Sequence, residues 1–538
     1  MQRRFRILII GATFLMGLPP AHAQIYKVTL SGQNEIPPAA TTGTGSGIVT
    51  LNSVMHEMRV IESFSGLVGA TTASHIHCCA VQPVNAGVAT TTPTFPGFPV
   101  GVTSGSMNRT YDMSLATTWN APFLTANGTP AGAEAAMIAG LAAGRAYLNV
   151  HTAAFPGGEL RGFFVLNVFA ANTALTQGAR NAATVLDSLG AGTGVLSDAL
   201  VSLASMAAAP QAAALENATP SPSRGVRLVT SEMVNTTFDQ ASARLDGYRL
   251  AGSSRLGALP DQGDNGVWAT INGVNSIQGQ SGGFAGYRNN GYGLAGGYDR
   301  QLQPDLNIGA AVSYSRASLA YRGQSIGDSA DIRSTQLSLY GSQDLGRVYL
   351  DGMAAYGWQK YKSTRNGGVT GTAAGAYSGQ LWGVRVGGGM PFAVLSNALI
   401  TPQAHLDWNS VKQDAYRETS GGPLALAVAA KTADRFQSSL GAQVDFAADT
   451  AVFKGRPYLR ATWHHEFKND GLDTSASFVS GGASFVTPGQ KLDGDTVTVG
   501  VGLNFYARNA FSAALTYDGT LGKSYQSQVL AARARWTF

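Results

Sequence analysis

The chain has 538 residues, of which 44% are hydrophobic and only 13% are charged, and it contains 67 glycines. Soluble domains carry roughly 25% charged residues and about 7% glycine, so this composition argues against a soluble cytosolic enzyme. It also argues against disorder, because 22 Phe, 19 Tyr and 7 Trp residues are too many aromatic side chains for a disordered chain.

A targeting signal occupies residues 1–23. Three arginines among the first six residues form a positive segment, Ile7 to Leu18 are apolar, and Ala21-His22-Ala23 is a small-residue cleavage site. We therefore expect export through the Sec translocon and a mature chain that begins at Gln24. Without the three arginines the formal net charge falls from +5 to +2, so the sequence predicts no nucleic-acid partner.

Two segments of different composition follow the signal. Residues 24–166 contain five Lys or Arg and six Asp or Glu residues among short runs of β type, which predicts a small, weakly charged β domain. Residues 167–249 turn to Ala, Leu and Ser at helical spacing, interrupted by glycines and by Pro220 and Pro222. We interpret this segment as a helical linker that ends in a helix from Thr230 to Arg249.

Residues 250–538 form a string of predicted strands of about ten residues that alternate at period two. In one strand, the odd-numbered residues of 497–505 are apolar and the even-numbered ones are small or polar. No later apolar run reaches the roughly 18 residues of a membrane helix, so any membrane span must be a β-barrel. A soluble β-sandwich also alternates, but it would not explain the signal peptide, the high glycine content or the closing aromatic strand.

Twelve candidate strands occur in this region, and closure of an antiparallel barrel requires an even number. Their centres lie near Trp268, Leu294, Val312, Leu339, Ala354, Val384, Leu406, Val444, Ala461, Val501, Leu515 and Ala534. The predicted fold is therefore all-β. It comprises a small β-sandwich-like N-terminal domain, a helical linker and a 12-stranded transmembrane β-barrel.

Several features of the C-terminal region occur together. They are the Ala/Leu-rich linker, Asp264-Asn265-Gly266-Val267-Trp268, Gly296-Gly297-Tyr298-Asp299, and a closing strand that carries Trp536 and Phe538 on one face. This set resembles the autotransporter β-domain, the translocator of type V secretion. The resemblance implies a lumen that holds the helix preceding the first strand, and export of the N-terminal segment to the cell surface. It also implies that Trp536 and Phe538 form the signal recognised by the barrel-assembly machinery.

The region also departs from the autotransporter pattern. Several autotransporters cut themselves at an Asn-Asn pair within the lumen helix, but here Asn235 is followed by Thr236. The nearby pair Asn289-Asn290 is expected in a loop between strands. We therefore predict that the N-terminal domain stays tethered to the barrel. An alternative keeps the barrel but leaves the N-terminal domain in the periplasm.

Residues 24–166 contain three motifs in order. They are Leu30-Ser31-Gly32-Gln33-Asn34-Glu35-Ile36-Pro37-Pro38, Ser74-His75-Ile76-His77-Cys78-Cys79, and the stretch from Asn149 to Gly162. Together they resemble the CHRD domain, a module found in chordin and in many secreted bacterial proteins. The resemblance implies a β-rich extracytoplasmic domain, with no firmly assigned biochemical activity.

Histidines in two of these motifs are candidate metal ligands. Residues i and i+2 of a strand share a face about 6.6 to 6.8 Å apart, so His75 and His77 are able to hold one metal ion. His151, helped by Glu159 or by the Cys78-Cys79 pair, would complete three or four ligands suited to copper or zinc. The His-x-His strand is similar to that of copper-zinc superoxide dismutase, although the region's four histidines are too few for a bridged copper-zinc centre.

A structural role is the alternative for the same residues. The histidines would then hydrogen-bond Ser74, Asn149 or backbone groups, while Glu159 and Arg161 form an ion pair. The Cys78-Cys79 pair is able to form a disulfide in an oxidising compartment or to remain as free thiols that help to bind a metal. Across a trans peptide the two Cα atoms would lie about 3.8 Å apart, below the usual disulfide range, so we expect a strained, easily reduced bond.

We therefore predict an outer-membrane autotransporter that displays its CHRD passenger at the cell surface in an adhesive or structural role. The enzymatic alternative is a surface-tethered copper- or zinc-binding redox protein that resembles superoxide dismutase and uses His75, His77 and His151. Expected partners are outer-membrane lipid, the Sec translocon, the barrel-assembly machinery and an undefined surface ligand.

Overall fold

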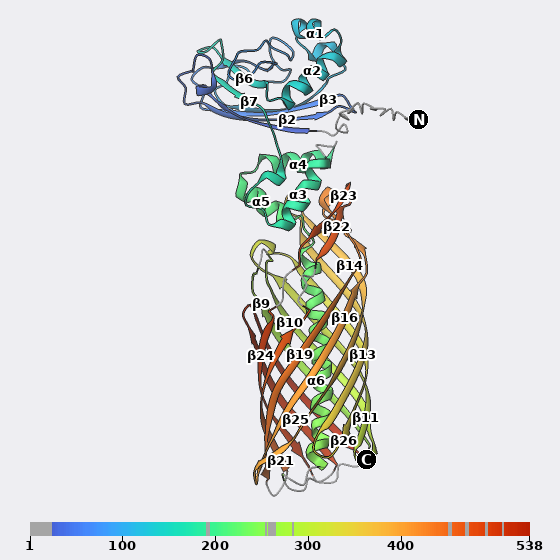
Figure 1. Ribbon diagram of the computed structural model, residues 1–538. Helices are drawn as coiled ribbons and strands as arrows, with labels where there is room; N and C mark the ends of the chain where they lie inside the picture. The colour runs from blue at the N-terminus through green and yellow to red at the C-terminus, as the bar shows by residue number, and fades with distance from the viewer. Residues whose placement is uncertain are drawn as a thin grey trace, which may run out of the picture. The chain divides into compact units, whose positions relative to one another are not determined.

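The structure is a computed structural model that describes residues 24–189, 194–252, 256, 265–281, 284–449, 454–468, 473–489, 493–507 and 510–538. The predicted signal peptide, residues 1–23, lies outside these ranges. Contacts divide the chain into two compact units (Figure 1). The first unit runs to Val168 and adds Leu186–Ser205, and the second comprises Phe169–Val185 and Met206–Phe538.

Eight antiparallel strands form one sheet within the described residues of the first unit, in the order β4-β6-β7-β1-β2-β3-β5, with β8 beside β1. They are β1 (Gln24–Ser31), β2 (Thr44–Asn52), β3 (Glu57–Ser65), β4 (Thr71–Cys78), β5 (Gly105–Asp112), β6 (Ala146–Thr152), β7 (Leu160–Phe163) and β8 (Val165–Leu166). Helices α1 (Ala121–Asn127), α2 (Pro130–Ala142) and α4 (Val195–Ser205) belong to the same unit.

The core of the first unit lies between one face of this sheet and helix α2. Tyr26, Val28 and Leu30 alternate along β1 and are each at most 4% exposed. Met137 and Leu141 of α2 belong to the same apolar cluster. Because side chains alternate between the two faces of a strand, the opposite face of the sheet is left for polar groups.

The predicted linker contains helices α3 (Gln177–Leu189), α4, α5 (Ala208–Glu216) and α6 (Ser221–Gly252). The helix expected to start at Thr230 begins at Ser221 instead. Pro222 lies in its first turn, where backbone N–H groups have no partner within the helix. A proline at this position starts a helix rather than breaking it, which explains the earlier start.

Twelve long antiparallel strands in the described part of the chain close into a barrel. They are β9 (Asn265–Gln278), β10 (Tyr287–Gln303), β11 (Leu306–Tyr321), β12 (Ser329–Asp344), β13 (Tyr349–Asn366), β14 (Thr372–Gly389), β16 (Ala398–Gln413), β19 (Lys431–Phe446), β21 (Lys454–Glu466), β24 (Asp495–Tyr506), β25 (Phe511–Gly522) and β26 (Tyr525–Thr537). Pairing of β26 with β9 and of β14 with β16 closes the ring. The predicted 12-stranded barrel is confirmed. Its longest strands have 18 residues rather than the predicted ten or so, and they therefore extend beyond the length that a bilayer requires.

Shorter strands accompany the barrel. β15 (Phe392–Leu395) pairs with β16, β20 (Ala448–Asp449) pairs with β21, and a separate sheet contains β17 (Tyr416–Arg417), β18 (Leu426–Val428), β22 (Thr474–Phe478) and β23 (Gly481–Thr487). The expectation that Asn289-Asn290 lies in a loop is wrong, because both residues belong to β10. Asn275 of β9 donates a hydrogen bond of 2.5 Å to the side chain of Asn290, and this cross-strand contact stabilises the strand there.

The alternation of the barrel strands separates a lipid face from a lumen face. Val497, Val499 and Val501 are 45%, 53% and 44% exposed on the outside. Inside, helix α6 runs through the lumen (Figure 1), and its residues Val234 and Phe238 pack against apolar residues of the barrel wall. Across the described residues, every helix is too short or too polar to cross a membrane.

Candidate functional site

Three histidines of the N-terminal domain come together on the sheet face opposite its apolar core. His75 and His77 lie on β4, and His151 lies on the neighbouring strand β6. The register places Ala73 opposite His151 and His75 opposite Asn149, so the three imidazole rings share a face. One ligand nitrogen from each ring lies within 4.8 Å of the other two.

A backbone carbonyl oxygen anchors each ring through one nitrogen atom. The distances are 2.7 Å from His75 Nε2 to Pro93 O, 2.9 Å from His77 Nδ1 to Ala86 O and 2.9 Å from His151 Nδ1 to Pro156 O. Because a carbonyl oxygen only accepts, the bonded nitrogen carries the proton and the second nitrogen carries a lone pair. These second nitrogens, His75 Nδ1, His77 Nε2 and His151 Nε2, are buried and have no hydrogen-bond partner in the described part of the chain.

The protonation state of the three rings suits metal binding. Burial lowers the pKa of all three histidines, and it lowers that of His77 to about 4. The rings are therefore uncharged at neutral pH, which is the form that binds copper or zinc. Carbonyl anchors of this kind also fix the tautomer and the orientation of a metal-binding imidazole.

Tyr147 and Arg161 support this cluster, and no motif in the sequence marks the role of Tyr147. The ring of Tyr147 stacks on His77, with 4.7 Å between centroids and 7° between planes, and the Arg161 guanidinium lies 3.8 Å from the Tyr147 centroid. The Tyr147 hydroxyl donates to Ala86 O at 3.2 Å, and Arg161 donates to Asn85 Oδ1 at 2.6 Å. These contacts hold the loop that anchors His77.

Glu159 lies apart from the histidine cluster and does not pair with Arg161 within the described residues. Its carboxylate accepts hydrogen bonds of 2.6 Å from Thr41 Oγ1, 2.7 Å from Thr152 Oγ1, 2.6 Å from Val68 N and 3.2 Å from Gly69 N. Burial favours the neutral carboxyl, but these bonds to the charged form outweigh it and lower the pKa of Glu159. The carboxylate therefore stabilises neighbouring loops rather than facing the histidines.

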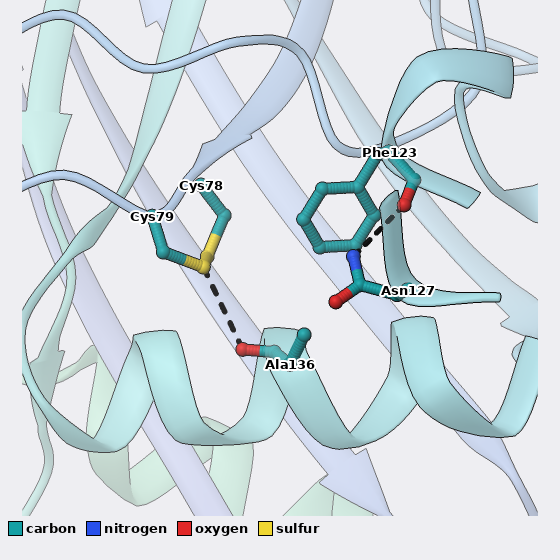
Figure 2. The surroundings of a disulfide bond; sticks show 5 residues. All are labelled: Cys78, Cys79, Phe123, Asn127 and Ala136. Atoms are coloured by element: carbon teal, nitrogen blue, oxygen red, sulfur yellow. Dashed lines mark hydrogen bonds between the residues drawn. A yellow bond between two sulfur atoms is a disulfide. The ribbon is translucent and has the colours of Figure 1, made fainter. Parts of the chain in front are cut away.

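Cys78 and Cys79 form a disulfide bond with each other (Figure 2). The assumption of a trans peptide is wrong, because the bond between these residues is cis and their Cα atoms lie 3.1 Å apart. Cys78 faces the apolar core, on the opposite side of β4 from His77. Gly140 of α2 leaves room for the disulfide, since a Cβ atom at that position would overlap both sulfur atoms. The sulfur atoms are therefore not brought to the histidine cluster.

In the second unit, Asp299 of β10 joins the lumen helix to the barrel wall. Arg244 of α6 donates two hydrogen bonds to its carboxylate, of 2.7 and 2.9 Å, and the Tyr248 hydroxyl donates a third of 2.5 Å. From the barrel wall, the Tyr340 hydroxyl donates to Asp299 Oδ2 at 3.3 Å, and Arg535 Nη2 lies 3.5 Å from Asp299 Oδ1. Asp299 is fully buried, so this cluster holds α6 in the lumen by charge as well as by packing.

The barrel region and the N-terminal domain match two different known families. Residues 267–518 match the family described as Autotransporter beta-domain. This part of the chain is an autotransporter β-domain. Residues 26–164 of this autotransporter match the CHRD domain. The protein accordingly resides in the outer membrane.

Relatives of the autotransporter are much longer than this chain. It is 26% identical over 307 residues to outer membrane protein B of Rickettsia typhi. The matched region covers 53% of this chain and 18% of that protein. It is 24% identical over 305 residues to an extracellular serine protease of Serratia marcescens. This matched region covers 56% of this chain and 28% of that protein. The chain thus spans less than a third of the length of either relative.

Two of the solved structures similar to this chain are domains of other autotransporters. The translocator domain of NalP from Neisseria meningitidis is 16% identical, with a TM-score of 0.44, and the match covers 58% of this chain and 99% of that one. The β-domain of the Bordetella autotransporter BrkA is 18% identical, with a TM-score of 0.41, and covers 51% of this chain and 100% of that one.

Proposed function

We propose that this autotransporter displays its own CHRD domain at the cell surface, where the domain has a binding or structural role. Helix α6 carries the proposal, because it fills the lumen and precedes β9 in the chain. The buried ion pair between Arg244 and Asp299 supports a helix that remains in place after export. The barrel then acts as a membrane anchor for the segment that precedes α6.

The CHRD domain is expected to stay attached to the barrel. Asn235 of α6 is followed by Thr236 rather than by a second asparagine, and its side-chain oxygen accepts a 2.9 Å hydrogen bond from Asn409 of the barrel wall. We expect immunoblots with an antibody to the CHRD domain to detect the full-length chain in outer membranes. A fragment of the size of that domain in the culture medium would contradict the tether.

Protease added to intact cells tests surface display. The CHRD domain is expected to be digested while the barrel remains, because lipid and lumen packing protect the strands. A periplasmic protein that survives the treatment serves as the control for membrane integrity. A CHRD domain that is digested only after the outer membrane is opened would instead support the periplasmic alternative.

Assembly partners follow from the same proposal. The Sec translocon would export the chain, and the barrel-assembly machinery would insert it into outer-membrane lipid. Trp536 and Phe538 are 57% and 66% exposed on the outward side of the last strand and its end, where a signal for that machinery is accessible. The ligand of the displayed domain is undefined.

A second candidate function is a surface-tethered copper or zinc protein. Three buried imidazole nitrogens without hydrogen-bond partners in the described residues favour it, because leaving such atoms unpaired costs free energy that a metal ion would recover. Copper would supply redox chemistry of the superoxide dismutase kind, whereas zinc has no redox chemistry of its own. Tyr147 and the carbonyl anchors would hold the three rings in position.

Metal analysis of the purified chain tests this candidate. His75→Ala and His77→Ala are each expected to lower copper or zinc affinity by at least about tenfold, since loss of even an outer-shell partner costs that much. His56→Ala is the control, because His56 is half-exposed and pairs with Glu134 at 2.8 Å, away from the cluster. Electron paramagnetic resonance of the copper-loaded chain reports nitrogen coordination. Absence of stoichiometric metal in the wild-type protein would reject this candidate.

A further inference from the structure

The outward face of the barrel changes from apolar to cationic at one height on three neighbouring strands. The exposed side chains that lie on the apolar side of this change are Val312 and Tyr314 on β11, Leu337 on β12, and Trp358 on β13. Toward the other end of these strands, and beyond the outward Thr335 on β12, the outward residues are Arg316 on β11, Arg333 on β12, and Lys360 and Lys362 on β13. The register places Arg316 opposite Arg333 and Arg333 opposite Lys360, so three cations stand side by side.

These cations are poorly neutralised by the protein. Arg316 pairs with Asp331 at 3.4 Å, but Arg333, Lys360 and Lys362 have no ion-pair partner within the described residues. Like charges directly opposite each other on adjacent strands destabilise a sheet. An external anion would remove this repulsion, so we define Arg333, Lys360 and Lys362 as the cationic row.

The cationic row borders a hollow in the barrel surface. A cavity of about 320 Å³ is lined by these three residues together with Asp331 of β12, which lies opposite Lys362, and Ser378 of β14, which lies opposite Lys360. Trp358, the outward neighbour of Lys360 on β13, contacts Tyr356, which also contacts Trp382, with ring centroids 4.8 and 4.5 Å apart. Aromatic side chains of this kind mark the membrane interface on an outer-membrane barrel. The hollow therefore lies at headgroup level.

The row is on the outer-leaflet side of the membrane. The hydroxyl of Tyr321, at the end of β11 beyond Arg316, donates a 2.8 Å hydrogen bond to Pro222 O in the first turn of α6. This is the end of the barrel from which α6 leads back to the CHRD domain. The inference rests here on the proposed function: if the CHRD domain is displayed at the cell surface, the barrel end at which α6 begins faces outward.

We propose that the cationic row binds the phosphorylated headgroup of a glycolipid in the outer leaflet. Arg333 would donate two parallel hydrogen bonds to a phosphate group, and the two lysines would contribute point charges. Acyl chains would lie along the apolar band that contains Val312, Leu337 and Trp358. An anionic phospholipid offers the same charge but lacks a sugar to fill the hollow beside Ser378, which favours the glycolipid.

Native mass spectrometry of the full-length chain in detergent tests the proposal, with diphosphoryl lipid A as the probe. The triple variant R333Q/K360Q/K362Q is expected to bind this lipid at least about tenfold more weakly, as each cation near an anionic surface contributes several-fold to affinity. The matched control R300Q/R347Q/K523Q removes three exposed cations at other strand ends and should bind as the wild type does. The variant R333K/K360R/K362R keeps the charge and should retain binding within about threefold, since only the bidentate geometry changes.

Two further lipids complete the experiment. One is lipid A from which the phosphates have been removed, and the other is phosphatidylglycerol. Both are expected to bind the wild-type chain more weakly than diphosphoryl lipid A does. Equal binding of the dephosphorylated lipid, or an unchanged affinity of the triple variant, would overturn the site. Equal binding of phosphatidylglycerol would overturn the assignment to a glycolipid. Binding is measured in detergent and display on cells, so failure here and failure of surface display are distinguishable.

Discussion

Asp299→Asn is expected to destabilise the assembled barrel by about 3 to 5 kcal/mol, the cost of removing one partner from a buried ion pair. Asparagine has nearly the same shape as aspartate but no charge. Arg244 and Arg535 would then face each other in the lumen, where both are 4% exposed, without the carboxylate between them. The Tyr248 hydroxyl would also lose its charged acceptor.

Urea unfolding of the full-length chain in detergent measures this effect. Tryptophan fluorescence reports the transition, since Trp268 donates a 2.7 Å hydrogen bond to Tyr340, which itself contacts Asp299. Asp434→Asn is the control because its ion pair with Lys468 at 3.2 Å is partly exposed, and we expect a loss below about 1 kcal/mol. Similar losses for the two variants would show that the lumen cluster does not anchor α6.

Glu62→Gln is expected to stabilise the CHRD domain in alkaline solution. Glu62 is 1% exposed, and the Ser74 hydroxyl, 3.0 and 2.9 Å from its two oxygens, is its hydrogen-bond partner. Burial raises the pKa of Glu62 to about 8, and the bond from Ser74 only partly opposes this shift. Glutamine keeps the shape and the hydrogen-bonding capacity of the protonated acid without its ionisation.

The pH dependence follows from the difference between folded and unfolded states. Below about pH 4.5 Glu62 is protonated in both states, so its contribution to stability is complete. As the pH rises toward 8, the unfolded chain releases this proton and the folded domain keeps it, so stability falls by about 3 to 5 kcal/mol. Glu35, whose pKa burial raises to about 7, adds a loss of the same sign.

Hydrogen exchange of full-length protein, followed on peptides from β3 and β4, measures this difference. At pH 8 to 9 the Glu62→Gln variant is expected to exchange these amides more slowly than the wild type, whereas near pH 5 the two proteins should agree. Glu57→Gln on the same strand controls for the removal of one negative charge from β3. Equal protection of wild type and Glu62→Gln across this pH range would contradict a protonated, buried Glu62.

The position of Glu62 on the core side of β3 follows from the alternation of the strand. Val60, Glu62 and Phe64 occupy alternate positions of β3, and all three are at most 4% exposed. A carboxyl group in an apolar alternation is the signal that marks such a residue. Its partner is Ser74 of β4, a strand that does not pair with β3, and the alternation does not reveal this contact.

The histidine cluster was partly predictable. Period-two alternation places His75 and His77 on the same face whatever the rest of the fold does. His151 joins them only because β6 pairs with β4 in a register that sets His151 opposite Ala73. Which nitrogen of each ring remains unpaired depends on carbonyl groups of other loops, such as Pro93 O and Ala86 O.

The sequence alone was sufficient to predict the barrel, its twelve strands and the side of each strand that faces lipid. These features depend on consecutive residues, since the side-chain period of a strand is local. The tertiary structure decided which nitrogen of each clustered histidine remains unpaired and which groups become the partners of Glu159 and Asp299. These features depend on groups brought together from distant segments, and only the folded chain determines which donor meets which acceptor.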